Sequence, residues 1–406
     1  MKIYLVGGAV RDKLLGLPVK DKDYVVVGST PKQMVDMGFR PIGKDFPVFL
    51  HPKTQEEYAL ARTERKTAKG YKGFQFNTDI SVTLEDDLAR RDLTINAMAQ
   101  DIQCKEIIDP YEGKKDLEDR VLRHVSPAFL EDPVRILRIA RFAARYEYLG
   151  FKVDKKTNEL MQGMVANGEV DALVSERVWQ ELSKALNETT PSEFVRVLRA
   201  CGALKILFPE FDKLFGVPQT KKWHPEIDTG IHCMMAMDKA AELENDTAFA
   251  VFTHDLGKGI TPADVLPSHK GHEAAGVPLV KAVCERLKVP TGYKRLALIV
   301  CRWHLHSHTA FELKAATIHK LFINTGAYQS ETQLDKFLQA CQADATGRLG
   351  LEFTEYPQAN YLRECFKSTL KVDVQALIKR GFEGQKLGAE IDQERIKLIK
   401  QVKDSQ

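Results

Sequence analysis

The sequence lacks several features that mark particular classes of protein. Its seven cysteines are odd in number, widely scattered and contain no Cys-x-x-Cys pair. This pattern argues against a disulfide framework and against a structural zinc site, and it favours a reducing cytoplasm as the location. No apolar run approaches the ~20 residues that cross a bilayer, so we expect no membrane contact. The first residues also lack the apolar stretch and cleavage site of a signal peptide.

A strong charge of either sign is also missing, since the 406 residues carry a net charge of only +3. A protein that bound nucleic acid over its whole surface would be more basic, so any RNA contact must come from local patches. The sequence shows no internal repeat and no low-complexity tract. Hydrophobic residues make up 44% and charged residues 28%, which is ordinary for a globular protein of several domains.

Strand-like patterns dominate the first 60 residues. Runs rich in β-branched and aromatic residues predict strands at 3–6, 24–27, 46–50 and 58–61. A short amphipathic segment lies between the first two runs. The stretch 62–77 is rich in Lys, Arg and Gly and has no clean period, so we expect a mobile basic loop there.

Helical patterns follow. Apolar residues from Leu84 to Met98 keep three-to-four-residue steps apart from one gap, which predicts a helix. A second helix is expected to start at Asp132-Pro133, because a capping residue is followed by proline. Beyond residue 150 the pattern is almost entirely helical. The predicted fold class is therefore α+β, with a small head followed by an all-helical body.

The order of glycines and carboxylates near the N-terminus is the sharpest signal. Gly7 and Gly8 follow the first expected strand, and Asp21 and Asp23 open the next. Side chains two apart on a strand point to one face, so the two carboxylates would lie together and favour a bound Mg²⁺. The glycines let a backbone approach a triphosphate, and Arg11 could bind a phosphate. A solvated surface turn is the alternative, which the combined order disfavours.

Three motifs carry a family resemblance. The runs GGAVRD at residues 7–12 and DKDYVVVGS at residues 21–29 are similar to the nucleotidyltransferase head of the DNA polymerase β superfamily. LARRDLTINA at residues 88–97 resembles the RRDFTINA motif of class II tRNA nucleotidyltransferases, with Leu in place of Phe. EDPVR at residues 131–135 resembles the same family's EDxxR helix. Together the motifs cover about the first 150 residues in the right order.

The resemblance implies a polymerase-β-like head that adds C, C and A to the 3′ end of tRNA, using CTP, ATP and Mg²⁺ and releasing pyrophosphate. It implies that Asp21 and Asp23 are catalytic metal ligands. Nucleotide binding would fall to six residues, Gly8, Arg11, Arg91, Asp132, Arg135 and Arg138.

Other positions have less defined roles. The resemblance assigns Asp92 and Asn96 to organising the site, although both could equally be hydrogen-bonding residues on a helix surface. Glu57 is a candidate for a third catalytic carboxylate. The basic stretch after Arg62, with Lys66, Lys69 and Lys72, resembles the family's flexible loop, which is implicated in the switch from CTP to ATP.

Asp132 and Arg135 also make chemical sense as a base-reading pair. Cytosine and adenine both present an amino donor beside a ring-nitrogen acceptor, which a carboxylate and a guanidinium can match. Uracil and guanine present a carbonyl and a ring N–H in the same places and would be rejected. Asp132 could instead be only a helix cap, with Arg135, Arg138 and Arg145 forming a solvated basic stripe.

A histidine cluster marks the body. Its members are His232, the pair His254-Asp255, then His269, His272 and His304, and later Asp344. The cluster resembles the HD superfamily of metal-dependent phosphohydrolases. The resemblance implies a metal held by His232, His254, Asp255 and Asp344. Imidazole nitrogens mixed with carboxylates suit Ni²⁺ or Mn²⁺ better than Mg²⁺. The expected substrates are 2′,3′-cyclic nucleotides, 2′-nucleotides and other phosphoesters; the alternatives are core histidines or an HD fold that has lost its metal.

The predicted division of the chain is a head at residues 1–140, a helical RNA-binding neck at 141–225, an HD domain at 226–330 and a helical tail at 331–406. The closest family form is the CCA-adding enzyme with a C-terminal HD domain, which we expect to be a monomer or homodimer. A bacterial poly(A) polymerase shares the head, but it usually has a strongly basic extension and no HD domain. A tRNA-binding protein with an inactive head, and an enzyme that adds only CC or only A, are further alternatives.

Overall fold

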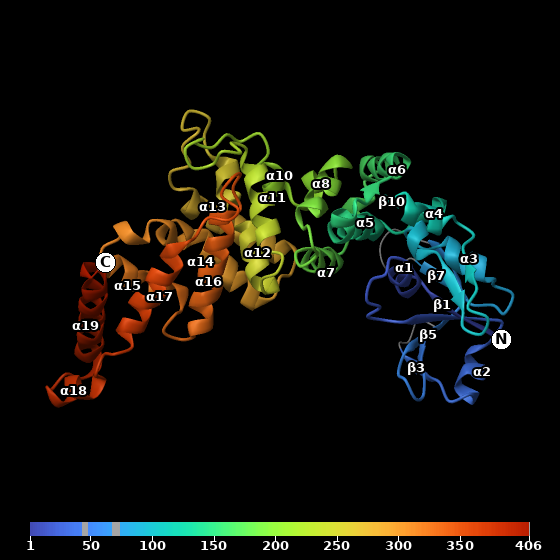
Figure 1. Cartoon of the computed structure of the whole chain (residues 1–406), viewed down its shortest axis with the longest axis horizontal. Helices are drawn as coiled ribbons and strands as arrows, with labels where there is room; N and C mark the ends of the chain where they lie inside the picture. Colours follow the sequence, from blue (N-terminus) through green and yellow to red (C-terminus); the bar gives the residue numbers. More distant parts are fainter. Residues whose placement is uncertain (43–47, 67–73, 406) are drawn as a thin grey trace. The chain divides into compact units, whose positions relative to one another are not determined.

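The computed structural model describes residues 1–42, 48–66 and 74–405, with the backbone alone at 64–66 and 74–76. The chain forms two compact units (Figure 1). Unit 1 comprises Met1–Leu182 and Glu193–Leu207, and unit 2 comprises Ser183–Ser192 and Phe208–Gln406. None of the helices in the described ranges has both the length and the apolar composition that a bilayer-crossing segment requires. The finer division into four domains stays a prediction.

A mixed sheet forms the centre of unit 1. In the described ranges its seven strands are β1 (Lys2–Val6), β2 (Asp23–Val27), β3 (Arg40–Ile42), β4 (Val48–Leu50), β5 (Glu57–Leu60), β8 (Ala99–Asp101) and β9 (Ile107–Ile108), in the order β3-β4-β5-β2-β1-β8-β9. Only β2 and β5 run parallel among these neighbours. Val6, the last residue of β1, pairs with Asp23, the first residue of β2. The turn after β1 and the start of β2 therefore lie side by side at the same end of these two central strands.

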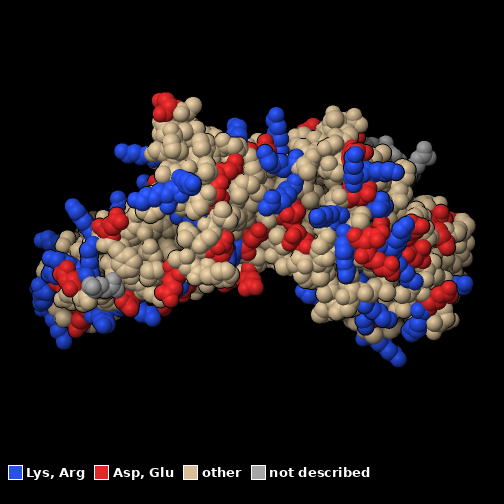
Figure 2. All heavy atoms as spheres, turned by 45° about the horizontal axis from the view of Figure 1, so that its top comes forward, with Lys and Arg blue, Asp and Glu red and all other residues tan. Residues whose placement is uncertain are grey.

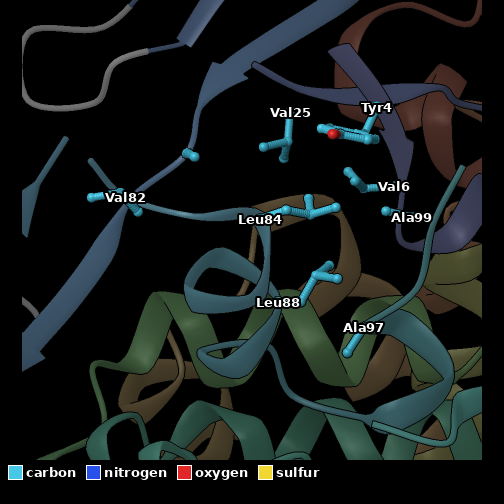
Figure 3. Close-up of a cluster of buried hydrophobic side chains, with 9 residues drawn as sticks. Tyr4, Val6, Val25, Val82, Leu84, Leu88, Ala97 and Ala99 are labelled. Carbon is cyan, nitrogen blue, oxygen red and sulfur yellow. The ribbon is translucent and has the colours of Figure 1, made fainter. Parts of the chain in front are cut away.

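Alternation along the strands gives the sheet two buried faces. On one face, Tyr4, Val6 and Val25 pack with Leu84 and Leu88 of α3 (Leu84–Ala89), as Figure 3 shows. On the other face, a second cluster contains Val26, Phe49, Tyr58 and Leu60 together with Met34 of α2 (Pro31–Asp36). Burial on both sides holds the central strands in place, so the ends of these strands form a firm base for polar side chains.

The predicted helix from Leu84 to Met98 is wrong in extent. Helix α3 ends at Ala89, and the chain continues through a short 3₁₀ turn at Thr94–Asn96 into strand β8. Ile95 and Met98 are fully buried, like Leu88. Their spacing imitates a helix because the chain passes through the core as a turn and a strand, and burial rather than helical period selects the apolar side chains.

The basic stretch 62–77 also differs from the prediction of a loop without regular structure. Strands β6 (Thr63–Lys66) and β7 (Phe74–Asn77) form an antiparallel pair, from Thr63 opposite Asn77 to Lys66 opposite Phe74. Lys69 and Lys72 lie outside the described residues, and so does the side chain of Lys66. The family-based role of this segment remains a prediction.

Helices dominate the rest of the chain, which confirms the predicted α+β class with a helical body. In unit 1, the sheet is followed by α5 (Val134–Tyr146), α6 (Lys155–Ala166), α7 (Ser175–Ala185) and α8 (Ser192–Ala200). The last residues of α7 and the first residue of α8 are assigned to unit 2. A two-residue parallel pairing of β10 (Val121–Leu122) with β11 (Lys152–Val153) lies beside α5. Helix α5 begins with Pro133 in the N-cap position, one residue later than the sequence suggested.

Unit 2 is built from stacked helices. The helices that carry the histidine cluster are α11 (Thr229–Lys239), α12 (Asn245–Thr253), α13 (His272–Arg286), α14 (Thr291–His308) and α16 (Glu331–Thr346). Helices α12, α14 and α16 pack closely on one another, and α11 packs on α12 and α16. Their contact faces are apolar, with Phe249, Val300 and Phe337 buried. The packing brings polar residues from distant parts of the sequence to one point.

The C-terminal helices complete unit 2. They are α15 (Ala315–Thr325), α17 (Pro357–Thr369), α18 (Val374–Lys379) and α19 (Gly384–Asp404), and α19 packs on α15 and α17. Ile399 is the buried residue of α19, and the other side chains of this helix are half-buried or exposed. Figure 2 shows Lys and Arg side chains, with Asp and Glu side chains among them, at the end of unit 2 where α18 and α19 lie.

Candidate functional site

A cleft of about 610 Å³ opens in unit 1 where the starts of β2 and β5 meet the turn after β1. Its walls carry many charged side chains. The predicted residues that line it are Gly8, Arg11, Asp21, Asp23, Arg91, Asp132, Arg135 and Arg138, joined by Gly7, Glu57, Asp92 and Asn96. The structure therefore brings together all the residues that the sequence motifs marked in the head.

Carboxylates form one wall of the cleft. Asp23 is the first residue of β2 and lies opposite Glu57, the first residue of β5, in the parallel pairing. Asp21 lies two residues before the strand rather than within it. Partial burial raises the pKa of Asp23; Arg91 opposes this rise, and the carboxylate of Asp21 adds to it. The cost of keeping both aspartates ionised side by side is what a divalent cation would remove.

Arg91 lies directly over the glycine turn. Gly7 has a φ of 67°, and a Cβ at this position would lie 3.0 Å from Nη1 of Arg91. The Nη2 atom of Arg91 donates to Oδ2 of Asp87, a fully buried carboxylate, at 3.1 Å. The Nε atom of Arg91 is buried and has no hydrogen-bond partner among the described residues. A guanidinium with an unused donor beside a glycine turn is suited to bind an anionic oxygen.

Arg11 is held on the cleft wall from several sides. Its Nε donates to Oδ1 of Asp12 at 2.8 Å, and its Nη1 donates to Oδ1 of Asn96. The guanidinium also lies 5.2 Å and 5.1 Å from the ring centroids of Phe142 and Tyr146. These contacts leave the side chain almost fully buried, so its position at the cleft is fixed before any ligand binds.

Asp92 organises the middle of the cleft. Its Oδ2 accepts from Nε of Arg138 at 2.7 Å, and its Oδ1 accepts from Nδ2 of Asn96 at 2.9 Å and from the backbone N–H of Leu93 at 2.8 Å. Burial alone would raise the pKa of Asp92, but the Arg138 guanidinium and the hydrogen bonds lower it well below its usual range. Asp92 is thus a buried anion that orients Arg138 and Asn96, rather than a residue on a helix surface.

Asp132 and Arg135 both reach the cleft, but they do not lie on one helical face. Asp132 precedes α5 in an extended conformation, and its Oδ1 accepts from the backbone N–H of Val134 at 3.0 Å. The same carboxylate forms a two-pronged ion pair with Arg177 of α7, at 3.2 Å and 2.9 Å. Arg135 donates to the backbone carbonyl oxygens of Ala128 and Arg90. Asp132 precedes the N-cap residue Pro133, and its carboxylate both accepts from the first helical N–H of α5 and lines the cleft.

Sequence reasoning gave no nucleotide-binding role to several basic residues of the cleft. Lys20, Arg62, Arg90, Arg141, Arg145 and Arg177 line it as well. Arg141 donates to Glu181 at 2.7 Å, and Arg177 and Glu181 both come from α7. No sequence pattern connects α7 to the glycine turn across about 170 residues. For α5, the sequence indicated a basic stripe of Arg135, Arg138 and Arg145, without Arg141.

A second cluster lies in unit 2, and it unites the predicted metal ligands. Nε2 of His232 lies 3.1 Å from Oδ1 of Asp344 and 3.7 Å from Oδ2 of Asp255. Nε2 of His254 lies 3.2 Å from Oδ2 of Asp255 and 3.7 Å from Oδ1 of Asp344. All four side chains are almost fully buried. They come from α11, the end of α12 and α16, which explains why residues up to 112 positions apart can form one group.

Further histidines border this group. Nε2 of His272 and Nε2 of His304 lie 3.3 Å and 3.7 Å from Oδ1 of Asp255, and 3.3 Å from each other. His308 binds the other side of Asp344, at 2.6 Å from Oδ2. His306 points elsewhere, toward Trp303 with ring centroids 4.7 Å apart. Of the three histidines at the end of α14, His304 and His308 therefore contact the cluster and His306 does not.

The cluster contains buried polar atoms that have charged neighbours but no partner in hydrogen-bond geometry. Among the described residues, both carboxylate oxygens of Asp255 and the Nε2 atoms of His232 and His254 are buried and lack a partner in hydrogen-bond geometry. Burial would raise the pKa of Asp255, but His254 and Lys258 lower it well below its ordinary value. Burial lowers the pKa of His304 well below its ordinary value, which keeps that ring neutral. His nitrogens and Asp oxygens in this arrangement could hold a cation.

Other contributors to the cluster were not predicted. Lys258 places its Nζ 2.6 Å from Oδ2 of Asp255, and Arg348 places its Nη2 3.2 Å from Oδ1 of Asp344. Glu226 lies with its Oε1 3.2 Å from Nδ1 of His232 and also accepts from His224 at 3.0 Å. Because burial is the largest influence on His224, its pKa falls to about 4. Lys258 follows Asp255 by three residues, so the local sequence could have indicated its proximity to the cluster. No sequence pattern indicated that Glu226 would contact His232.

Comparison with known proteins agrees with this architecture. The chain matches the poly A polymerase head domain over residues 3–123, a probable RNA and SrmB-binding site of polymerase A over 150–215, and the HD domain over 229–345. It is 56% identical to the multifunctional CCA protein of Thioalkalivibrio sulfidiphilus over 99% of both chains. Solved structures of a CCA-adding enzyme in an apo form, and of the Thermotoga maritima enzyme complexed with tRNA, share the fold, with TM-scores of 0.66 and 0.63 at 21% and 20% identity. They cover 99% and 100% of this chain, which in turn covers 88% and 91% of theirs.

Proposed function

This chain belongs to the multifunctional CCA protein family, and we propose that it adds C, C and A to the 3′ end of tRNA in the cytoplasm, from CTP and ATP, with Mg²⁺ as cofactor. The solved relative complexed with tRNA supports the choice of acceptor. Agreement with full-length multifunctional CCA proteins disfavours a poly(A) polymerase. An enzyme that adds only CC or only A would differ in the number of residues that it adds to a tRNA acceptor.

The proposal rests on one observation: the carboxylate wall and the basic wall face the same cleft. Asp21 and Asp23 would hold Mg²⁺, with Glu57 beside them in the pairing of β2 with β5. When bound, the metal supplies charge neutralisation and activation of an attacking hydroxyl. The raised pKa of Asp23 fits this assignment, since burial and the neighbouring Asp21 carboxylate outweigh the charge of Arg91 and a bound cation would offset them.

The basic wall would position the triphosphate. Arg91 places its Nη1 beside the Gly7 turn, and Arg11 is fixed by Asp12 and the two rings that flank it. Neither guanidinium needs to reorganise much to meet an anion. Pre-positioned charges of this kind stabilise developing negative charge more effectively than mobile ones.

Base selection would fall to Asp132 and to the arginines of α5. A cytosine or adenine amino group can donate to the Asp132 carboxylate, and a guanidinium can donate to the ring nitrogen. In the free protein, Asp132 is engaged by Arg177 and Arg135 by two backbone carbonyl oxygens. An incoming base therefore has to share or replace these bonds, which disfavours a base that offers no matching donor.

The catalytic assignment is tested by replacing the metal-binding carboxylate. Asp23→Asn should reduce nucleotide addition by at least about 10³-fold, because loss of an electrostatic stabiliser of this kind costs several kcal/mol of transition-state energy. Lys22→Ala is a matched control, since Lys22 is half exposed and lies 3.7 Å from Glu56, outside the carboxylate wall. We expect the control to stay within a few-fold of the original rate. Full activity of Asp23→Asn would place the catalytic centre elsewhere.

We also propose a phosphohydrolase activity for the HD domain in unit 2. The buried atoms of His232, His254 and Asp255 that lack hydrogen-bond partners support it, because His nitrogen and Asp oxygen together fit Ni²⁺ or Mn²⁺. A metal held there would supply Lewis acidity and a water of lowered pKa. The proposed substrates are 2′,3′-cyclic nucleotides, 2′-nucleotides and simple phosphomonoesters. Hydrolysis of these compounds by the full-length protein should appear with Ni²⁺ or Mn²⁺ and disappear after metal removal by a chelator.

A further inference from the structure

Two loops of unit 2 carry large apolar side chains that are exposed to solvent. One loop, residues 220–227, precedes α11, and the other, residues 347–353, follows α16. The exposed fraction is 59% for Trp223, 44% for Ile227 and 56% for Leu349. Tryptophan is a highly buried residue type on average, and exposed apolar side chains that gather in one place mark binding surfaces. We call these three residues the apolar patch.

Hydrogen bonds join the two loops to each other and to the histidine cluster. Arg348 lies between them: its Nη1 donates to the carbonyl oxygen of Trp223 at 3.3 Å, and its Nη2 donates to Oδ1 of Asp344 at 3.2 Å. The next residue, His224, has its ring centroid 4.6 Å from that of His232. A single guanidinium thus separates the backbone of Trp223 from a carboxylate of the cluster, so this exposed ring borders the cluster.

The backbone of both loops is held in place by specific contacts. Ile227 has a φ of 63°, which is unfavourable for a β-branched residue. Its N–H donates to the carbonyl oxygen of His224 at 2.9 Å, and its own carbonyl accepts from the N–H of Gln219 at 2.7 Å. At the start of the other loop, a Cβ at Gly347 would lie 2.4 Å from Cα of Ala236 in α11. A costly conformation that is fixed in this way is typical of binding sites.

Positive charge accompanies the apolar patch. Nζ of Lys222 lies 4.6 Å from the ring centroid of Trp223, and the Arg348 guanidinium lies on the side of the cluster. An aromatic ring has two faces, so one ammonium leaves the other face for a ligand. A flat ring with cations around it suits a ligand that combines a planar group with negative charge, as a nucleotide does. An uncharged apolar peptide would make no use of these cations.

From these contacts we propose that Trp223 stacks on the nucleobase of a substrate whose phosphoester reaches the histidine cluster. The inference rests on the proposed phosphohydrolase function and narrows its substrate class to nucleoside phosphoesters, which bind better than phosphoesters without a base. A ribose phosphate carries its base and its phosphate on one sugar, which matches the short connection from Trp223 through Arg348 to Asp344. Stacking uses the face that every base has, so the contact accepts all four bases.

The test compares adenosine 2′-monophosphate with glycerol 2-phosphate, a phosphomonoester that has no base, as substrates of the full-length protein with Mn²⁺. Trp223→Ala should raise KM for the nucleotide by roughly 5- to 150-fold, which is the usual contribution of one base–aromatic stack. We expect kcat for the nucleotide, and both constants for glycerol 2-phosphate, to stay within a few-fold. Trp223→Phe retains an aromatic face and should recover most of the affinity.

Tyr148→Ala is the matched control, because Tyr148 is 52% exposed and lies in unit 1. It should leave both substrates unaffected. An RNA oligonucleotide that ends in a 2′-phosphate distinguishes two sources of the same ligand, a free nucleotide and an RNA end. Trp223→Ala should raise KM for both, and the substrate with the lower KM in the original protein identifies the source.

The outcomes separate this inference from the function on which it rests. An unchanged KM for the nucleotide in Trp223→Ala would overturn the base contact and leave the phosphohydrolase function standing. An equal loss on both substrates would show that Trp223 supports the cluster, and it would overturn the contact as well. Should the original protein hydrolyse neither compound, the phosphohydrolase function fails. Fluorescence then decides the contact: adenosine 2′-monophosphate should quench the emission that Trp223→Phe removes, and no quenching would overturn it.

Discussion

At the scale of single residues, the cleft of unit 1 depends on buried charges that are each held by named partners. Asp87 fixes Arg91, and Asp92 fixes Arg138 and Asn96. An ion pair with this burial is costly to break, because the remaining charge has no water to solvate it. The side chains that would meet a nucleotide are thus already oriented in the free protein.

Asp132 is the residue whose role is most open to test, because it both caps α5 and faces the cleft. Asp132→Ala should raise misincorporation of UTP and GTP by roughly 5- to 150-fold, since a lost base contact is worth about 1–3 kcal/mol. Competition between labelled nucleotides at the first addition step measures this ratio. Asp132→Ser is the control, because serine can cap a helix but reaches less far. It should recover thermal stability and not selectivity; unchanged selectivity in both variants would leave Asp132 as a cap alone.

Much of this site could be predicted from local sequence. Gly7, Gly8, Asp21 and Asp23 lie within 17 positions, so their strand–turn–strand context predicted their proximity. Arg177 could not be found in this way, because its partner Asp132 is 45 positions away and only the packing of α7 joins them. Glu57 is intermediate between these cases. Its carboxylate made it a candidate from the sequence, but only the parallel pairing of β2 with β5 shows that it lies beside Asp23.

At the scale of helices and strands, close approach of backbones fixes the histidine cluster of unit 2. A Cβ at Gly257, in the turn after the His-Asp pair, would lie 2.0 Å from the carbonyl oxygen of His272 and 2.7 Å from the backbone nitrogen of Gly276. Glycine at Gly257 therefore lets the 3₁₀ turn Leu256–Ile260 pack directly on α13. The sequence showed this glycine beside the His-Asp pair, but not which helix it would contact.

Gly257→Ala should destabilise unit 2 by about 1–3 kcal/mol or more, because the backbone atoms it would meet cannot move aside as a side chain can. Differential scanning calorimetry should show the transition of unit 2 lowered by roughly 2–4 °C per kcal/mol. Gly292→Ala is the control, because a Cβ there meets nothing within 4 Å and its φ is not in the left-handed region. Equal melting curves for the two variants would contradict the close packing of Gly257 on α13.

The wrong helix between Leu84 and Met98 has a physical explanation at this scale. Residues of a buried turn and of a buried strand are apolar for the same reason as residues of a helix face, so a short run cannot distinguish them. The long helix α5 was predicted because its apolar period repeats over several turns, and beyond residue 150 the same kind of period predicted helices without giving their bounds. The short strands β6 and β7 were missed because they flank a basic stretch with no alternation.

At the scale of the whole molecule, the two proposed activities belong to different compact units, with the carboxylate wall in unit 1 and the histidine cluster in unit 2. Each cluster is complete within its own unit. Asp255→Asn should therefore abolish phosphoester hydrolysis and leave nucleotide addition within a few-fold of its original rate, and Asp23→Asn should do the reverse. Paired assays on one preparation of each variant measure both activities. Loss of both activities in either variant would show that the units do not act independently.

The most direct test of the central claim uses tRNA that lacks its three terminal nucleotides, incubated with the full-length protein, Mg²⁺ and each labelled nucleotide. We expect CTP alone to extend the RNA by two residues, ATP to add one further residue only after CTP, and UTP and GTP to add none. With both substrates, extension should stop at three residues. Continued growth into an adenine tail, or no extension of the tRNA by any nucleotide, would contradict the assignment of this protein as a CCA-adding enzyme.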